Sequence, residues 1–159
     1  MIKTYMIAKR YALSGSRIEI STAAGELCWQ VKGRLLVFLR QRFTVVDADD
    51  AVVATIRQED ALAPQNYTVA EGDNDIGFVM QPGLWPTYHL LFQAYDAPVQ
   101  INIGHGFKTT FPLVMEDRTF ATAYLCGMKW QLELPEESLA PYPLLIGLAA
   151  VYSDYMGMG

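Results

Sequence analysis

Cysteine and histidine are scarce in this sequence, and the sites that depend on them are correspondingly hard to build. The 159 residues include two cysteines and two histidines. Cys28 and Cys126 fit neither a metal-binding spacing nor a disulfide framework, so each is expected to be a small buried hydrophobe in a reducing compartment. His89 and His105 lack a nearby cysteine pair or carboxylate cluster, which argues against a metal site.

The common catalytic and nucleotide-binding motifs are also missing. There is no Gly-x-Ser-x-Gly, no phosphate-binding glycine-rich loop and no dinucleotide fingerprint. Acidic clusters at 47–50 and 73–75 lack the bidentate glutamate of an EF-hand, and turn chemistry explains them better. The sequence therefore predicts no catalytic residue, no metal ligand and no cofactor.

Long apolar runs are absent too. The longest, Leu144 to Tyr152, has nine residues, whereas a membrane span needs about 20. The first ten residues have no continuous apolar stretch, so they do not form a secretory signal. With 52% hydrophobic and 18% charged residues, the chain is too apolar for disorder. We expect one domain over residues 1–159, cytoplasmic, with peripheral membrane association left open.

Charge is unevenly placed along the chain. The net charge is −5, yet residues 1–42 hold eight basic and two acidic residues, and the remainder holds four basic and fifteen acidic residues. Such asymmetry indicates either an anionic partner or two regions that neutralise each other in the fold, and the second interpretation is favoured. With a sequence pI near 4.9, nucleic acid is not expected as a partner.

The most informative feature is an internal repeat. Residues 17–32 read as strand, turn and strand, and residues 42–57 repeat the pattern 25 positions later without a gap. A third copy at 67–80 follows with a shift of 24, and a looser fourth spans 88–101. Apolar and polar residues alternate within each strand, which is typical of half-buried antiparallel strands. Repeated hairpins at this spacing predict an all-β barrel or sandwich.

Further strands are expected at 108–115, 119–124 and 128–134, with turns at 116–117 and 126–127. After them comes one helix, whose first turn holds Pro141 and Pro143. Its body, Leu144 to Tyr152, is apolar on every side, so it must be buried all round. We expect it inside the barrel, with Gly147 allowing close approach of strand side chains. The rival interpretation is partial insertion into a membrane or a partner.

The hairpin array, with Glu26 to Arg34 followed by Phe43 to Asp47, and the apolar segment Leu144 to Tyr155 resemble the LURP-one-related proteins. That family is similar in fold to the tubby C-terminal domain and the phospholipid scramblases. The resemblance implies a closed antiparallel barrel of about twelve strands around a central C-terminal helix. The Pro-rich region and Cys-rich palmitoylation stretch of scramblases are missing, which argues against scramblase activity.

Tubby domains bind phosphoinositide headgroups through basic residues that include a Lys-x-Arg pair. Arg40 and Arg42 have a similar spacing, and Lys32 and Arg34 are nearby. These four residues are the predicted ligand-binding surface. The first hypothesis is a non-enzymatic module that binds an anionic membrane lipid or a protein partner. The alternatives are a carrier or enzyme with a pocket at the barrel mouth, and an oligomeric structural protein. An exposed Trp85 would indicate a further recognition surface.

Overall fold

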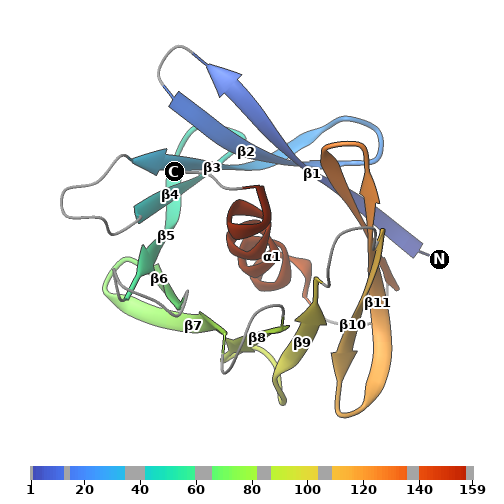
Figure 1. Ribbon diagram of the computed structural model, residues 1–159. Helices are drawn as coiled ribbons and strands as arrows, with labels where there is room; N and C mark the ends of the chain where they lie inside the picture. Colours follow the sequence, from blue (N-terminus) through green and yellow to red (C-terminus); the bar gives the residue numbers. More distant parts are fainter. Residues whose placement is uncertain are drawn as a thin grey trace.

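The predicted hairpins are present, and they belong to a closed barrel (Figure 1). The computed structural model describes residues 2–12, 15–34, 42–59, 66–81, 87–103, 109–135 and 140–156. Within these ranges the strands are β1 Ile2–Ala12, β2 Gly15–Thr22, β3 Leu27–Arg34, β4 Arg42–Asp47, β5 Val52–Gln58, β6 Tyr67–Glu71, β7 Asn74–Met80, β8 Thr87–Phe92, β9 Val99–Asn102, β10 Thr110–Met115, β11 Arg118–Cys126 and β12 Lys129–Pro135, and the helix is α1 Pro141–Met156.

Each strand pairs antiparallel with its neighbours in the chain, and β1 pairs with β12 to close the barrel. Closure leaves no sheet edge open to another strand. The fold class predicted from the sequence is therefore confirmed. The strand β1 was not predicted, and the last hairpin turn is formed by Gly127 and Met128, one residue later than expected, because Cys126 still pairs with Lys129.

The first two repeats share one register. Ile18 lies opposite Val31 in the β2–β3 hairpin, and Phe43 lies opposite Ile56 in the β4–β5 hairpin, 25 positions later. Both hairpins have a register shift at the equivalent place, after Ile20 in the first. The paired apolar side chains point inward on every strand, so the repeat supplies the barrel lining.

The third repeat departs from the gapless alignment by one residue. Tyr67 takes the place of Phe43, but it pairs with Val79 where the alignment requires Met80. The cause is a shorter turn, in which Gly72 follows the last paired residue of β6 at a φ of 59°. This left-handed conformation is the one that glycine adopts at least cost, and it allows a two-residue loop.

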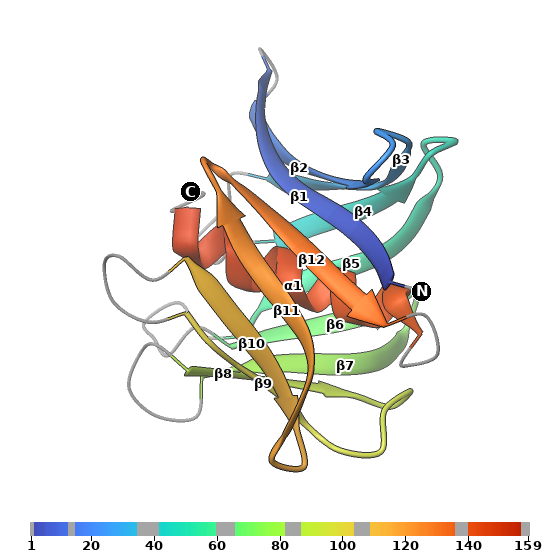
Figure 2. The same cartoon turned by 90° about the vertical axis from the view of Figure 1, so that its right-hand side faces the viewer.

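The helix α1 runs through the middle of the barrel (Figures 1 and 2). Residues 144–153 are all buried, which confirms the prediction that this segment is a core element. At Gly147 an added Cβ would lie 2.8 Å from Cε2 of Phe92, and at Gly77 it would lie 2.1 Å from Cδ1 of the same ring. The Phe92 ring thus fills a slot between α1 and β7 that two glycines leave open.

Two tyrosine hydroxyls hold the ends of α1. At the start, the Tyr95 hydroxyl accepts a hydrogen bond from the Leu144 amide at 3.0 Å and donates one to the Ala140 carbonyl. At the end, the Tyr152 hydroxyl donates to the Met128 carbonyl at 2.6 Å and accepts from the Lys9 amide at 3.0 Å. The helix is therefore fixed to the barrel by hydrogen bonds at both ends as well as by apolar packing.

Because consecutive strands run in opposite directions, the connections between them alternate between the two ends of the barrel. The turn end carries the hairpin turns at 23–26, 48–51, 72–73, 93–98 and 116–117, and α1 begins there beside Tyr95. The Met128 end carries the turn of Gly127 and Met128, and α1 approaches it at Tyr152. Figure 2 shows the helix crossing from one end to the other.

Candidate functional site

The barrel register gathers basic residues on the outer face of β2 to β5. Arg17 on β2 lies opposite Lys32 on β3, and Arg34 on β3 lies opposite Arg42 on β4. Arg42 in turn lies opposite Arg57 on β5. These positions alternate with buried residues of the barrel lining, so they belong to the outer face. We call Arg17, Lys32, Arg34, Arg42 and Arg57 the basic face.

Two of the predicted residues can be judged by their side chains. Arg42 is exposed, and within the described part of the chain no acidic side chain pairs with it. Lys32 is half-buried and forms an ion pair with Asp50, with 3.1 Å between Nζ and Oδ1. Arg34 is placed by its backbone pairing alone, and Arg40 lies outside the described residues.

Arg17 and Arg57 belong to the basic face but were not among the predicted site residues. The repeat could have found them, because a shift of 25 superposes Arg17 on Arg42 and Lys32 on Arg57. Both carry acidic neighbours. Nε of Arg17 lies 3.6 Å from Oε1 of Glu19. Nη2 of Arg57 lies 3.6 Å from Oε1 of Glu59 and 3.7 Å from Oδ1 of Asp75.

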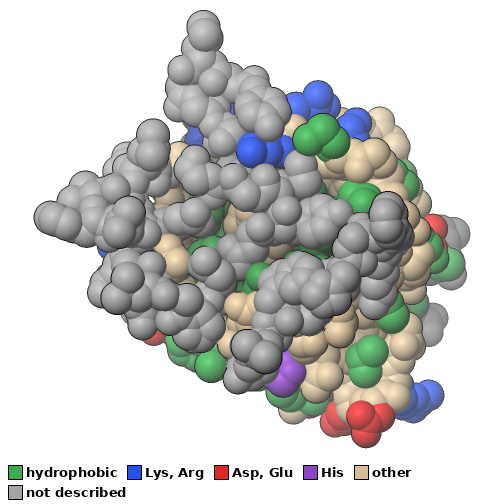
Figure 3. All heavy atoms as spheres, viewed as in Figure 1, with side chains coloured by type: hydrophobic (Ala, Val, Ile, Leu, Met, Phe, Trp, Pro, Cys, Tyr) green, Lys and Arg blue, Asp and Glu red, His purple; other side chains and the backbone are tan. Residues whose placement is uncertain are grey.

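Neutralisation between the basic N-terminal third and the acidic remainder is partial. The Lys32–Asp50 pair links the two regions, whereas Arg10 and Arg17 pair with Glu19 inside the first region. Figure 3 shows Lys and Arg side chains at the upper edge of one face, over the strands that Figure 1 labels β1 to β3, and a group of Asp and Glu side chains at its lower edge. A Lys or Arg side chain also lies beside the acidic group at the lower edge, so the two signs of charge are only partly separated on this face.

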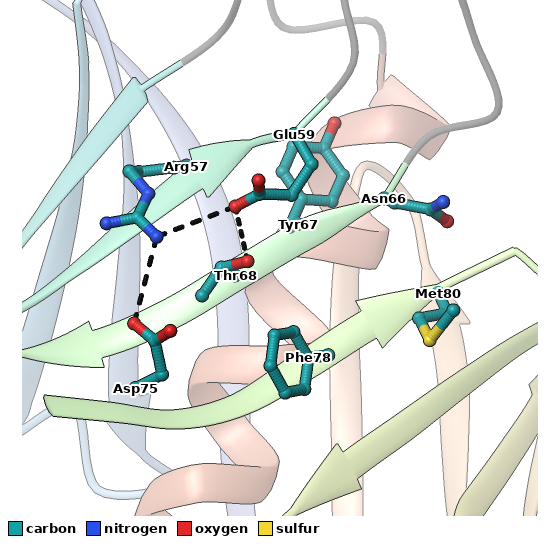
Figure 4. Close-up of a pocket in the computed structure, with 8 residues that line it drawn as sticks. All are labelled: Arg57, Glu59, Asn66, Tyr67, Thr68, Asp75, Phe78 and Met80. Atoms are coloured by element: carbon teal, nitrogen blue, oxygen red, sulfur yellow. Dashed lines mark hydrogen bonds and ion pairs between the residues drawn. The ribbon is translucent and has the colours of Figure 1, made fainter.

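A surface pocket of about 290 Å³ lies beside the basic face, on β5 to β7 (Figure 4). Its charged groups already satisfy one another, because Arg57 pairs with Glu59 and Asp75 and the Thr68 hydroxyl donates to Glu59. Its described lining includes an exposed Phe78 and no His, Cys or Ser. Among the described lining residues, the Thr68 hydroxyl does have a carboxylate beside it, but Glu59 is also paired with Arg57, which makes it a weak base.

Two further groups that could carry chemistry, the acidic cluster at Asp47 and the Cys28 thiol, have structural explanations. The carboxylate of Asp47 accepts hydrogen bonds from the amides of Asp49 and Ala51, so this acidic cluster serves as a turn. Burial raises the pKa of the Cys28 thiol, and the charge of Glu26 raises it further. That thiol is therefore not activated as a nucleophile. His89 lies on β8, half-buried, and His105 and Trp85 lie outside the described residues.

The interior of the barrel is occupied where the structure describes it. Trp130, Phe111 and Tyr152 are fully buried, and their rings contact one another at centroid distances of 5.3 and 5.4 Å. Trp29 packs against Tyr142 of the first helical turn, with 5.2 Å between ring centroids. A ligand chamber around the helix is thus not available among these residues. In the same part of the chain, no helix is both long enough and apolar enough to cross a membrane.

The described site is a basic outer face on a twelve-stranded barrel closed around a helix. No protein-family model matches the sequence, and no curated protein matches it. Among solved structures, the crystal structure of a protein from Arabidopsis thaliana is similar. The TM-score is 0.62, with 13% identity, covering 96% of this chain and 91% of that chain. This likeness supports a related fold for nearly the whole chain.

Proposed function

We propose that this protein is a non-enzymatic binding module whose basic face recognises the headgroups of anionic membrane phospholipids at the cytoplasmic surface. We also propose that it belongs with the LURP-one-related proteins, on the strength of its barrel, its central helix and its similarity to the Arabidopsis structure. The observation that carries the proposal is the position of Arg42, which is exposed and flanked across the sheet by Arg34 and Arg57.

Such an arrangement favours an anion for a physical reason. Like charges directly opposite each other on neighbouring strands destabilise a sheet. Three adjacent strands lie about 4.8 Å apart, so the three arginine positions span roughly 10 Å, a distance that one phosphate-bearing headgroup can bridge. Guanidinium groups bind phosphate through paired, charge-assisted hydrogen bonds. Arg57 is already held by two carboxylates, so Arg42 is the side chain most available to a ligand.

Co-sedimentation with vesicles tests the proposal. One set of vesicles contains phosphatidylcholine alone, and the other also contains phosphatidylserine. Each basic residue near an anionic surface contributes about 1 kcal/mol, so Arg42→Ala is expected to lower the partition coefficient about fivefold. The matched control is Arg118→Ala, which removes an exposed arginine from the turn end.

The control variant should bind within a factor of two of the wild type, and added salt should weaken binding of both proteins. Equal losses for the two variants would mean that net charge matters and the basic face does not. If the protein binds equally well to vesicles with and without phosphatidylserine, the lipid proposal is overturned and a protein partner becomes the better explanation.

A further inference from the structure

Charge is separated along the axis of the barrel. Every one of the five turns at the turn end contributes at least one exposed carboxylate: Glu26, Asp49, Asp73, Asp96 and Asp117. Lys3 and Arg118 offset only part of this charge. Basic side chains gather in the strand segments nearer the Met128 end: Lys9, Arg10, Arg17, Arg42, Arg57 and Lys129. Two acidic side chains of these segments offset part of this charge, because Glu19 pairs with Arg10 and Arg17, and Glu59 pairs with Arg57. Near an anionic surface, a molecule with this distribution is attracted at one end and repelled at the other.

An exposed apolar side chain marks the basic end. Met128 is 61% exposed and sits in the two-residue turn after Gly127, whose φ is 66°. Lys129 follows it directly and is exposed. The backbone of this turn is anchored, because the Met128 carbonyl accepts the hydrogen bond of the buried Tyr152 hydroxyl, and that hydroxyl also binds the amide of Lys9. The exposed Met128 side chain therefore projects from a backbone that is held in place by hydrogen bonds, and the basic side chain of Lys129 follows it directly.

We infer that the barrel approaches an anionic bilayer with its Met128 end, that the Met128 side chain enters the interfacial region, and that the turn end points away. This inference rests on the proposed function and adds an orientation to it. Apolar side chains flanked by basic residues combine two favourable terms at such a surface, the burial of apolar area and attraction to lipid phosphates. The long stem of Lys129 lets its ammonium stay at the phosphate level while its neighbour inserts.

Among the described residues, the other exposed large apolar side chains are Ile2, Val52 and Phe78. Ile2 is 60% exposed and precedes Lys3, but it begins β1 at the turn end, where the acidic turns gather. Val52 is 65% exposed, but it belongs to the turn end and follows Asp49 and Asp50 closely. Insertion of Val52 would carry these carboxylates to an anionic surface, where repulsion opposes binding. Phe78 is 42% exposed and lies on the side of the barrel, next to the ion pairs of Arg57. Val52 is therefore a matched control, equal in exposure and opposite in position.

The test uses environment-sensitive labels at the two ends. Met128→Cys and Val52→Cys are made separately in a Cys28→Ala and Cys126→Ser background, labelled with a nitrobenzoxadiazole probe and mixed with vesicles containing phosphatidylserine. At position 128 we expect a blue shift and quenching by lipids that carry a spin label in the acyl chain. At position 52 we expect an unchanged spectrum. Near-ultraviolet circular dichroism confirms that both labelled proteins are folded.

A second measurement needs no label and no change of cysteine. Met128→Ser should lower partition onto the same vesicles roughly three- to tenfold, the effect of losing part of one buried methionine side chain, whereas Val52→Ser should leave it unchanged. Suppose that the protein binds anionic vesicles while the changes at positions 128 and 52 alter probe emission or partition equally, or while only the change at position 52 does so. Either result overturns the proposed orientation and leaves the proposed function intact. Absence of any binding to anionic vesicles overturns both.

Discussion

Removal of the Tyr95 hydroxyl should destabilise the fold by about 2 kcal/mol. The first four amides of a helix have no partner within the helix. In α1, Pro141 and Pro143 remove two of these donors, and the Tyr95 hydroxyl accepts from a third, the fully buried Leu144 amide. In Tyr95→Phe that amide loses its partner in a dry environment, and an unsatisfied buried donor costs about 1–3 kcal/mol. The Ala140 carbonyl adds little, because Ala140 is exposed to water.

Urea and thermal unfolding followed by circular dichroism measure this loss. For a chain of this length, 2 kcal/mol corresponds to a decrease in the melting temperature of about 4–8 °C. The matched control is Tyr124→Phe, which removes a hydroxyl from a half-buried outer position and should change the free energy of unfolding by less than about 0.5 kcal/mol. If Tyr95→Phe is as stable as Tyr124→Phe, the Tyr95 hydroxyl does not hold the start of the helix.

Two further predictions concern the barrel core. Gly77→Ala places a Cβ 2.1 Å from Cδ1 of Phe92 and 2.8 Å from the Leu91 carbonyl oxygen. It should therefore destabilise the fold by about 1–3 kcal/mol. An unchanged urea midpoint would show that the Phe92 ring does not need the space left by Gly77. Burial raises the pKa of Tyr95 to about 12 from the usual 10. The unfolded chain therefore loses this proton first, and stability should fall between pH 10 and 12, by about 1.4 kcal/mol per pH unit. In Tyr95→Phe that slope should be shallower, and an identical slope would contradict the assignment.

The repeat allowed much of the fold to be predicted from the sequence. Because side chains alternate in a strand, aligned apolar positions such as Ile18 and Phe43 had to face the same side, and the structure places both in the barrel lining. The one-residue difference at Gly72 could not be predicted in the same way. Turn length depends on backbone angles that glycine permits but does not require.

The strand β1 was missed for a different reason. Its inward residues Tyr5 and Ile7 alternate with Met6 and Ala8, which are apolar although they lie on the outer face. The alternation of apolar and polar residues that marks a half-buried strand is therefore not visible in this part of the sequence. The strand becomes necessary only when the barrel has to close against β12, which is a long-range requirement that no local pattern expresses.

The candidate site shows the same division between local and long-range information. Arg42 and Lys32 were singled out because Arg40 and Arg42 have a spacing similar to the Lys-x-Arg pair of tubby domains, and Lys32 is nearby in the sequence. Arg57 stands among acidic residues in the sequence, so local charge does not indicate it. Its place in the repeat does, because the hairpin of residues 42–57 pairs it with Arg42. The separation of charge along the barrel axis likewise follows from the antiparallel topology, which collects all five acidic turns at one end.

Recognition of anionic phospholipid surfaces by this barrel can be measured as the partition of the wild-type protein onto vesicles that contain increasing amounts of phosphatidylserine. The partition coefficient should rise steeply with the anionic fraction and fall when the ionic strength is raised, because exposed charges are screened within about 10 Å at 0.1 M salt. A partition coefficient that is the same on neutral and anionic vesicles at low salt would contradict recognition of anionic surfaces.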